Sequence, residues 1–125
     1  MSKSELLKQR TKRNSIDILK FYRTLPNSEE ARIIGKQLIR SATSVAANYR
    51  AACRARSKAD FISKIGIVVE EADETSFWLE LIQDAGISTS VNIQSLLNES
   101  NEILAIMAAS QLTSKRNHQS TSKRQ

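Results

Sequence analysis

Turn-forming residues are scarce in this chain, and this scarcity limits the folds that it can adopt. In 125 residues there is one proline, Pro26, and only three glycines, Gly35, Gly66 and Gly86. Long stretches without these residues favour a few long elements over many short strands. Aromatic residues make up only 5% of the chain and β-branched residues show little alternation, so the sequence predicts an all-α protein with one domain.

The first two helices are predicted on either side of the single proline. The first covers residues 4–25 and stops there, because the residue before a proline is pushed out of the helical region. The second begins at Asn27 or Ser28 and extends to about residue 54. Asn27 followed by Glu30 resembles a capping box, in which each side chain bonds the backbone beside the other.

The third and fourth helices are predicted from a second capping pattern and a glycine stop. Ser57 and Asp60 open the third helix, which ends near Asp84, and Gly86 fits a C-terminal cap. Residues at heptad spacing line one face of this helix: Ile62, Ile65, Val69, Ala72, Ser76 and Leu79. The fourth helix covers residues 90–112.

Four long helices joined by short loops predict an antiparallel up-down-up-down four-helix bundle. Residues 1–114 would form this bundle. The remaining segment, residues 115–125, is polar and basic and is predicted to be a disordered tail.

Charge is distributed unevenly along the chain, whose net charge is +6. Residues 1–60 contain 14 basic and 5 acidic side chains, whereas residues 61–114 contain one lysine and 8 acids. Such asymmetry can serve a nucleic-acid partner, or it can pair the two halves within one molecule or between copies.

Two groups of cations are candidate nucleic-acid-binding residues. On the second predicted helix, five cations fall within about 80° of one another and form what we term the basic ridge: Arg32, Lys36, Arg40, Arg50 and Arg54. The first predicted helix carries an N-terminal basic patch: Lys8, Lys12 and Arg13. Three interpretations of the basic ridge are open. It is a solvated helix face, it forms ion pairs with the acids of the third helix, or it contacts phosphates.

The acidic run at residues 70–74 does not predict a metal site or a cofactor. Di-iron sites in helical bundles need Glu-x-x-His pairs, and the only histidine is His118 in the predicted tail. Glu71 and Glu74 are therefore expected to be structural acids near the basic turn at residues 54–58.

Polar and aromatic residues elsewhere do not predict an enzyme. No base accompanies the small polar side chains of the second helix, Ser41, Thr43, Ser44 and Asn48. We expect these residues to pack between helices, with Asn48 bonding a neighbouring helix or loop. Tyr49, Trp78 and the single Cys53 are expected to be buried in the core or at a subunit interface.

Most of residues 30–110 resembles one family. The matching positions lie in the second and third predicted helices and the turn between them: Gln37, Leu38, Arg40, Ser41, Ser44, Ala47, Asn48, Ser57, Asp60, Phe61, Glu71, Asp73, Glu74, Trp78 and Leu79. The stretch LLNESNEILAIM at residues 96–107 adds a fourth-helix pattern. The chain resembles the S23-type four-helix-bundle proteins encoded by intervening sequences in bacterial 23S ribosomal RNA genes. It is also similar to the accessory variability protein of diversity-generating retroelements.

The resemblance implies a bundle that assembles into a homopentameric ring. It also implies binding of RNA or DNA and, by analogy with the retroelement protein, a reverse transcriptase or another protein as partner. We therefore predict a non-enzymatic nucleic-acid-binding oligomer. The alternative is a protein-interaction scaffold whose charge asymmetry serves self-assembly.

A cytoplasmic location is predicted from the apolar pattern. The sequence has no run of 18 apolar residues, and its N-terminus lacks the apolar core of a signal peptide. Neither a membrane span nor a membrane partner is expected.

Overall fold

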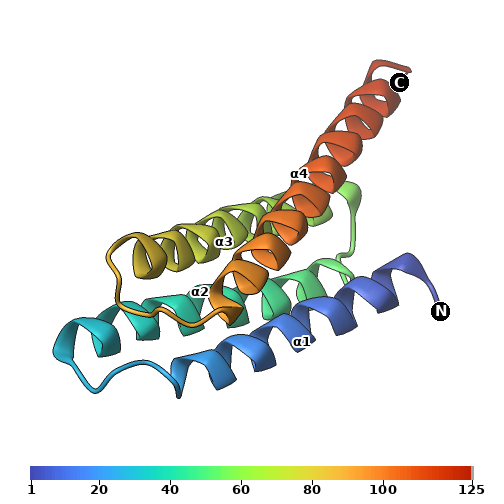
Figure 1. Ribbon diagram of the computed structural model, residues 1–125. Helices are drawn as coiled ribbons and strands as arrows, with labels where there is room; N and C mark the ends of the chain where they lie inside the picture. Colours follow the sequence, from blue (N-terminus) through green and yellow to red (C-terminus); the bar gives the residue numbers. More distant parts are fainter. Residues whose placement is uncertain (125) are drawn as a thin grey trace.

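The structure is a bundle of four helices, in which each helix is antiparallel to the next along the chain (Figure 1). This computed structural model describes residues 1–124, with side chains described up to residue 120, and it contains no strand over that range. The all-α prediction is therefore confirmed. The helices are α1 (Lys3–Tyr22), α2 (Glu29–Ala52), α3 (Lys58–Asp84) and α4 (Asn92–Arg124).

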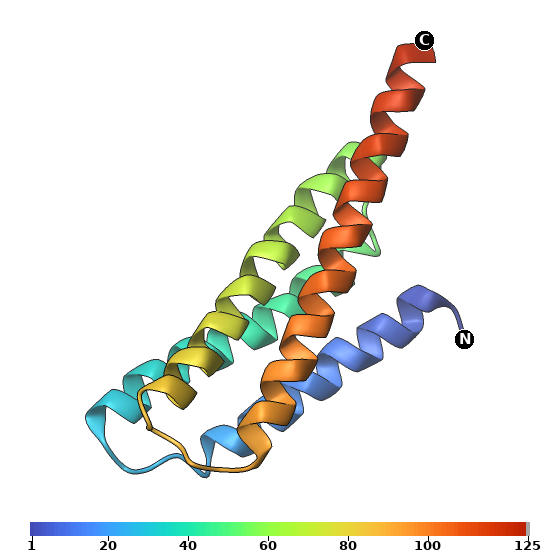
Figure 2. The same ribbon diagram turned by 45° about the horizontal axis from the view of Figure 1, so that its top comes forward.

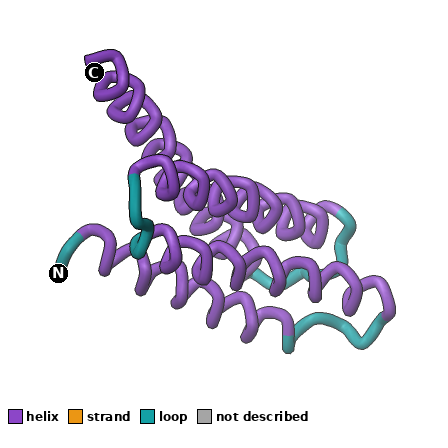
Figure 3. The backbone as a smooth tube through the Cα atoms, turned by 180° about the vertical axis from the view of Figure 1, so that it is seen from behind, coloured by secondary structure: helices purple, strands orange, loops and turns teal. Residues whose placement is uncertain are grey.

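Serine side chains start three of the helices, and the short loops between helices lie at the two ends of the bundle (Figure 3). Ser28 is the N-cap of α2 and accepts a hydrogen bond from the backbone N–H of Ala31. The N-cap is therefore Ser28, and the side chain of Asn27 instead accepts a hydrogen bond from Arg32. Ser57 caps α3 as predicted, and Gly86, with φ of 69°, follows its C-terminal end.

Helix α4 is longer than the sequence predicted, because it continues to Arg124 instead of ending near residue 112. The sequence analysis expected a disordered tail at residues 115–125, whereas the structure describes residues 115–124 as a continuation of α4, and Gln125 lies outside the described residues. No glycine or proline follows Gly86, and extending an existing helix by one residue is far easier than nucleating one. The end of α4 consequently projects beyond the rest of the bundle (Figure 2).

The core consists of two hydrophobic clusters. One lies toward the α1–α2 turn and contains Ile18, Phe21, Leu38, Ala42, Leu79, Ile82, Ile93 and Leu97. The other lies toward the α2–α3 turn and contains Val45, Tyr49, Ile65, Val68, Ala72, Ile103 and Met107. Residues spaced three or four apart on all four helices form the first cluster, and such residues on α2, α3 and α4 form the second, as an amphipathic bundle requires.

Between the clusters lies a buried set of small polar side chains, which we term the hydroxyl layer: Ser15, Ser41, Thr75, Ser76 and Ser100. Ser15 on α1 donates to the carbonyl of Ala42 on α2, at 3.2 Å. Thr75 on α3 donates to Ser41 on α2, at 3.0 Å, and Ser76 bonds Ser100 on α4, at 2.8 Å. The layer therefore links every pair of helices that are neighbours in sequence.

A close helix contact explains one of the two helical glycines. A Cβ atom on Gly35 of α2 would lie 2.6 Å from two ring carbons of Tyr22, at the end of α1. A Cβ atom on Gly66 of α3 would meet only the amide end of Gln111, at 3.3 Å. Gly35 thus allows the Tyr22 ring to cover α2, whereas an alanine would fit at the position of Gly66.

These two glycines make a matched stability test. Gly35→Ala should lower the free energy of unfolding by about 1–3 kcal/mol, because the Tyr22 ring must move. Gly66→Ala should raise it by up to about 1 kcal/mol, because alanine has the better helix propensity. Urea unfolding followed by circular dichroism measures both, and equal stabilisation by the two substitutions would contradict the close contact at Gly35.

Candidate nucleic-acid interface

A groove between α1 and α2 brings together cations from both predicted groups. Its walls carry Lys8, Lys12 and one acid, Glu5, from α1 and Arg50 and Arg54 from α2, and its volume is about 500 Å³. The floor is formed largely by small side chains: Ser15, Thr43, Ala46 and Ala47. We call this feature the basic groove.

The register of α1 against α2 creates the basic groove. The bond from Ser15 to the carbonyl of Ala42 aligns the two antiparallel helices. Counting away from that bond in opposite directions places Lys8 level with Arg50, about two turns farther along each helix. Cations that are 42 residues apart in sequence therefore face each other across one groove.

Most of these cations are available to a ligand. Lys12, Arg50 and Arg54 are exposed, and over the described part of the chain none of the three forms an ion pair. Lys8 pairs with Glu5, one turn away on the same helix. Exposed ion pairs of this kind contribute little stability, so a phosphate can compete for Lys8.

Arg40 belongs to a different part of the surface from the other cations of the basic ridge. Its guanidinium contacts Glu74 at 2.6 Å and Glu71 at 3.0 Å, both on α3. Burial alone lowers the pKa of Arg40, but hydrogen bonding to Glu74 and the charge of Glu71 outweigh it and raise that pKa. The acids were expected to lie near the turn at residues 54–58, and that expectation is wrong. The interpretation of the ridge as a match for acids of the third helix holds for Arg40.

The remaining candidate cations lie outside the basic groove. Arg32 donates to the side chain of Asn27 at 2.6 Å, near the α1–α2 turn. Lys36 is exposed on α2, one turn beyond Arg32 and away from the groove. Arg13 projects from α1 and makes a 3.6 Å contact with Asp17.

Acidic side chains occupy the diagonally opposite corner of the bundle. Helix α3 exposes a row of four acids, Glu70, Asp73, Glu80 and Asp84. Over the described residues α1 contacts α2 and α4 but not α3. A polyanion near the basic groove is therefore directed away from the acidic row.

Arg10 is a structural cation that the sequence analysis missed. Its guanidinium holds Glu99 of α4 in two hydrogen bonds, at 2.6 and 2.9 Å, and also contacts Glu102 at 3.0 Å. The hydrogen bond to Glu99 raises the pKa of Arg10 above its ordinary range, although burial opposes this shift. Arg10 thus fixes the side of α1 that faces away from the basic groove.

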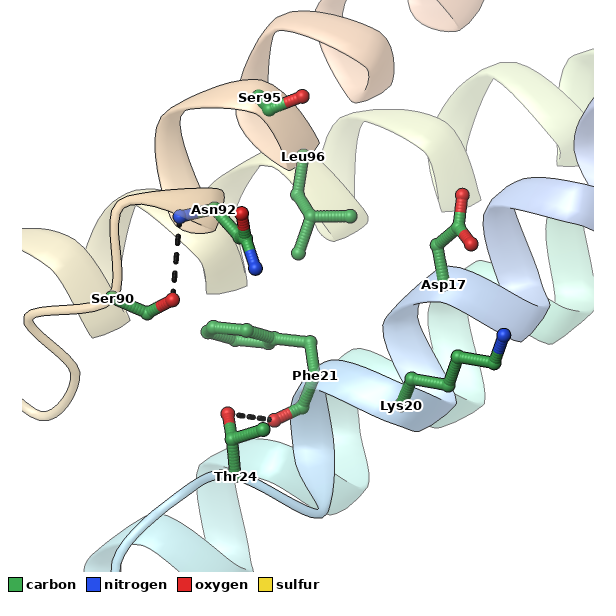
Figure 4. Close-up of a pocket in the computed structure, with 8 residues that line it drawn as sticks. All are labelled: Asp17, Lys20, Phe21, Thr24, Ser90, Asn92, Ser95 and Leu96. Atoms are coloured by element: carbon green, nitrogen blue, oxygen red, sulfur yellow. Dashed lines mark hydrogen bonds between the residues drawn. The ribbon is translucent and has the colours of Figure 1, made fainter.

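A second cavity lies at the other end of α1, against the start of α4 (Figure 4). It has a volume of about 330 Å³, and Asp17 and Lys20 supply its charged side chains. The hydroxyl of Thr24 donates to the carbonyl of Phe21, and Ser90 accepts from the N–H of Asn92. These polar groups bond the backbone at the end of α1 and at the start of α4, so they serve to cap helix ends.

The polar and aromatic residues that the sequence analysis singled out agree with the predictions in part. Asn48 donates to the backbone and hydroxyl of Ser44 on its own helix, not to a neighbouring helix or loop. Tyr49 is buried, and this burial, with a hydrogen bond to Cys53, raises the pKa of its phenol. Trp78 is half-buried and contacts the exposed ring of Phe77 edge-on, at 5.0 Å between ring centroids.

Two other classes of site are absent from the described residues. In that part of the chain, no three histidine, cysteine, aspartate or glutamate side chains are grouped closely enough to hold a metal ion. Over the same residues, no helix combines the length and hydrophobicity that a membrane span requires.

The fold agrees with comparisons to known proteins. The model of the family described as 23S rRNA-intervening sequence protein matches residues 5–109, so the chain belongs to this family. The crystal structure of a protein of unknown function from the S23 ribosomal protein family of Bacteroides thetaiotaomicron is 34% identical, with a TM-score of 0.79. That match covers 88% of this chain and 98% of the other. No curated protein matches the chain.

Arg40 and Lys36, both exposed on α2, provide a test of the structural assignment. Arg40→Ala should lower the free energy of unfolding by about 0.5–1 kcal/mol, because it removes two carboxylate contacts between α2 and α3. Lys36→Ala should change it by less than about 0.3 kcal/mol, as expected for an unpaired surface cation. Urea unfolding at low and high salt measures both, and an equal effect of the two substitutions would show that Arg40 does not clamp α3.

Proposed function

We propose that this protein is a non-enzymatic binder of nucleic acid that contacts phosphates through the basic groove. The observation that carries the proposal is the convergence of Lys8, Lys12, Arg50 and Arg54 on a floor of small side chains. Three of these cations have no ion-pair partner within the described residues, so their charge is available to an external anion. The chain's excess of positive charge supports the same partner.

The proposed contacts are electrostatic and independent of base sequence. Lysine and arginine side chains that neutralise phosphates release counterions, which makes affinity fall steeply with salt. The acidic row on α3 repels a polyanion, so it orients the nucleic acid toward α1 and α2. In the cytoplasm, where we propose that the protein is located, it would encounter both RNA and DNA.

We further propose the homopentameric ring that the family resemblance implies. In a ring, one surface of each copy contacts a different surface of the next. The chain carries opposite charges on two corners of its bundle, and this arrangement would favour contact between neighbouring copies. Repetition of the basic groove around a ring would increase the positive potential that attracts a polyanion.

A second candidate function, a protein-interaction scaffold, is favoured by one observation on α3. Phe77 is 52% exposed and Ile67 is 43% exposed, and both lie among the acids of that helix. Exposed apolar side chains bordered by charge are typical of protein contacts. A reverse transcriptase or another protein is the partner that the resemblance implies.

Paired substitutions on α2 test the basic groove. Arg50→Ala with Arg54→Ala should weaken binding of a labelled nucleic acid at least about tenfold at 0.1 M salt, and should reduce the salt slope by about 2. Arg32→Ala with Lys36→Ala removes the same charge from the same helix outside the groove, and should weaken binding less than about threefold. Fluorescence anisotropy over a salt series measures both, and equal losses would assign binding to net charge alone.

The ring is tested by the native mass of the protein. A subunit of 14.0 kDa predicts about 70 kDa for a pentamer. Sedimentation equilibrium at several concentrations measures this mass. A single species near the subunit mass would contradict the ring and leave the basic groove to act in a monomer.

A further inference from the structure

We infer that a cavity at the α2–α3 end of the bundle binds the phosphorylated end of a single nucleic-acid strand, and we call it the end cavity. All four helices supply part of its lining, and its volume is about 500 Å³. Figure 2 shows the α2–α3 turn and the projecting part of α4 at this same end. The volume suits one nucleotide, since small-molecule sites occupy about 300–1,000 Å³. This inference rests on the proposed function and deepens it, because it names the part of the nucleic acid that is recognised.

The inner lining of the end cavity suits a base. Tyr49 and Ala52 are its most buried residues, with 6% and 1% of their surface exposed, so they form its floor. The ring of Phe61 also lines the cavity and is only half-buried, which leaves part of it open to a ligand. Proteins that bind single strands stack bases on such rings. None of the described residues that line the basic groove is aromatic, so the end cavity supplies what the groove lacks.

The charged lining of the end cavity suits a terminal phosphate. Arg56 and Lys58 are exposed, and within the described residues neither forms an ion pair. The described lining contains no acid, and the nearby Asp60 is already paired with Lys64 at 2.6 Å. A terminal phosphate carries about −1.5 to −2 charges at pH 7, whereas a phosphate within a strand carries one. Two unpaired cations therefore favour the end of a strand over its middle.

The end cavity adjoins the basic groove. Neighbouring residues line the two sites: on α2 and its turn Arg54 lines the groove and Arg56 the cavity, and on α1 Glu5 lines the groove and Ser4 the cavity. Glu5 is paired with Lys8, which reduces its repulsion of a strand that passes. Two residues span at most about 7 Å, so a strand bound along the groove reaches the cavity directly. The buried floor then stops the strand, and only its last nucleotide enters.

The test uses the full chain and three versions of one DNA strand of about 12 nucleotides, labelled on an internal base. One version carries a 5′-phosphate, one a 3′-phosphate and one neither. At least one phosphorylated strand should bind at least about fivefold tighter than the unphosphorylated strand at 0.1 M salt, because hydrogen bonds to charged groups are the stronger ones. Fluorescence anisotropy measures this preference.

Three variants assign the preference to the end cavity. Arg56→Ala with Lys58→Ala should reduce it to below about twofold. Lys115→Ala with Arg116→Ala removes the same charge from α4 at the same end, outside the cavity lining, and should leave it unchanged. Phe61→Leu keeps an apolar side chain but removes the ring, and should weaken binding of the phosphorylated strand about fivefold. The same substitution should not affect a strand whose terminal nucleotide lacks its base.

Each outcome separates this inference from the proposed function. Equal affinity for the three strands would overturn the role of the end cavity while the basic groove still binds nucleic acid, and no binding of any strand would overturn the proposed function itself. A preference that survives Arg56→Ala with Lys58→Ala would place the terminal phosphate elsewhere and overturn the inference.

A free mononucleotide is the other possible source of the same chemical group. AMP, measured by isothermal titration calorimetry, should bind at least about tenfold more weakly than the phosphorylated strand, because the strand also contacts the basic groove. AMP binding as tight as that of the strand would overturn the assignment to a strand end.

Discussion

The hydroxyl layer is the constraint on which the arrangement of the bundle depends. Apolar heptads alone would allow neighbouring helices to slide past one another, because one apolar layer resembles the next. Ser15, Ser41, Thr75, Ser76 and Ser100 are buried and hydrogen-bonded in the observed register. A shifted register would place buried hydroxyls against apolar side chains, at about 1–3 kcal/mol for each unpaired group. Their small size also lets the helices approach closely in the middle of the bundle.

The functional surface follows from that register. When Ser15 of α1 is bonded to Ala42 of α2, the cations of the two helices meet in the basic groove. At the outer corners, Arg10 pairs with an acid of α4 and Arg40 pairs with an acid of α3. These two cations are therefore not available to a phosphate. The resulting charge separation gives the bundle one face that attracts a polyanion and another that repels it.

The sequence predicted the elements of this protein better than their contacts. The number of helices, the cap at Ser57 and the glycine stop at Gly86 depend on local preferences, and the structure has all three. The length of α4 was underestimated, because polar composition suggested disorder where no residue interrupts the helix.

The candidate site could be predicted only in part, because it depends on how two helices align. The positions of single helices showed which cations share a face, and all five cations of the basic ridge are exposed. They did not show that Arg40 reaches Glu71 and Glu74, or that Arg50 faces Lys8 across a groove. Both facts require the register between helices, which buried serines and threonines set, and a sequence pattern does not reveal which of these residues pair.

Lysine footprinting tests the central claim most directly, because it reads individual side chains in an assembly of any size. The full chain would be acetylated with and without duplex DNA, and each lysine quantified by mass spectrometry. We predict protection of Lys8 and Lys12, which line the basic groove, and none at Lys36 or Lys64, which lie outside it. Equal protection of all four, or protection of Lys64 on the acidic helix alone, would contradict a nucleic-acid interface between α1 and α2.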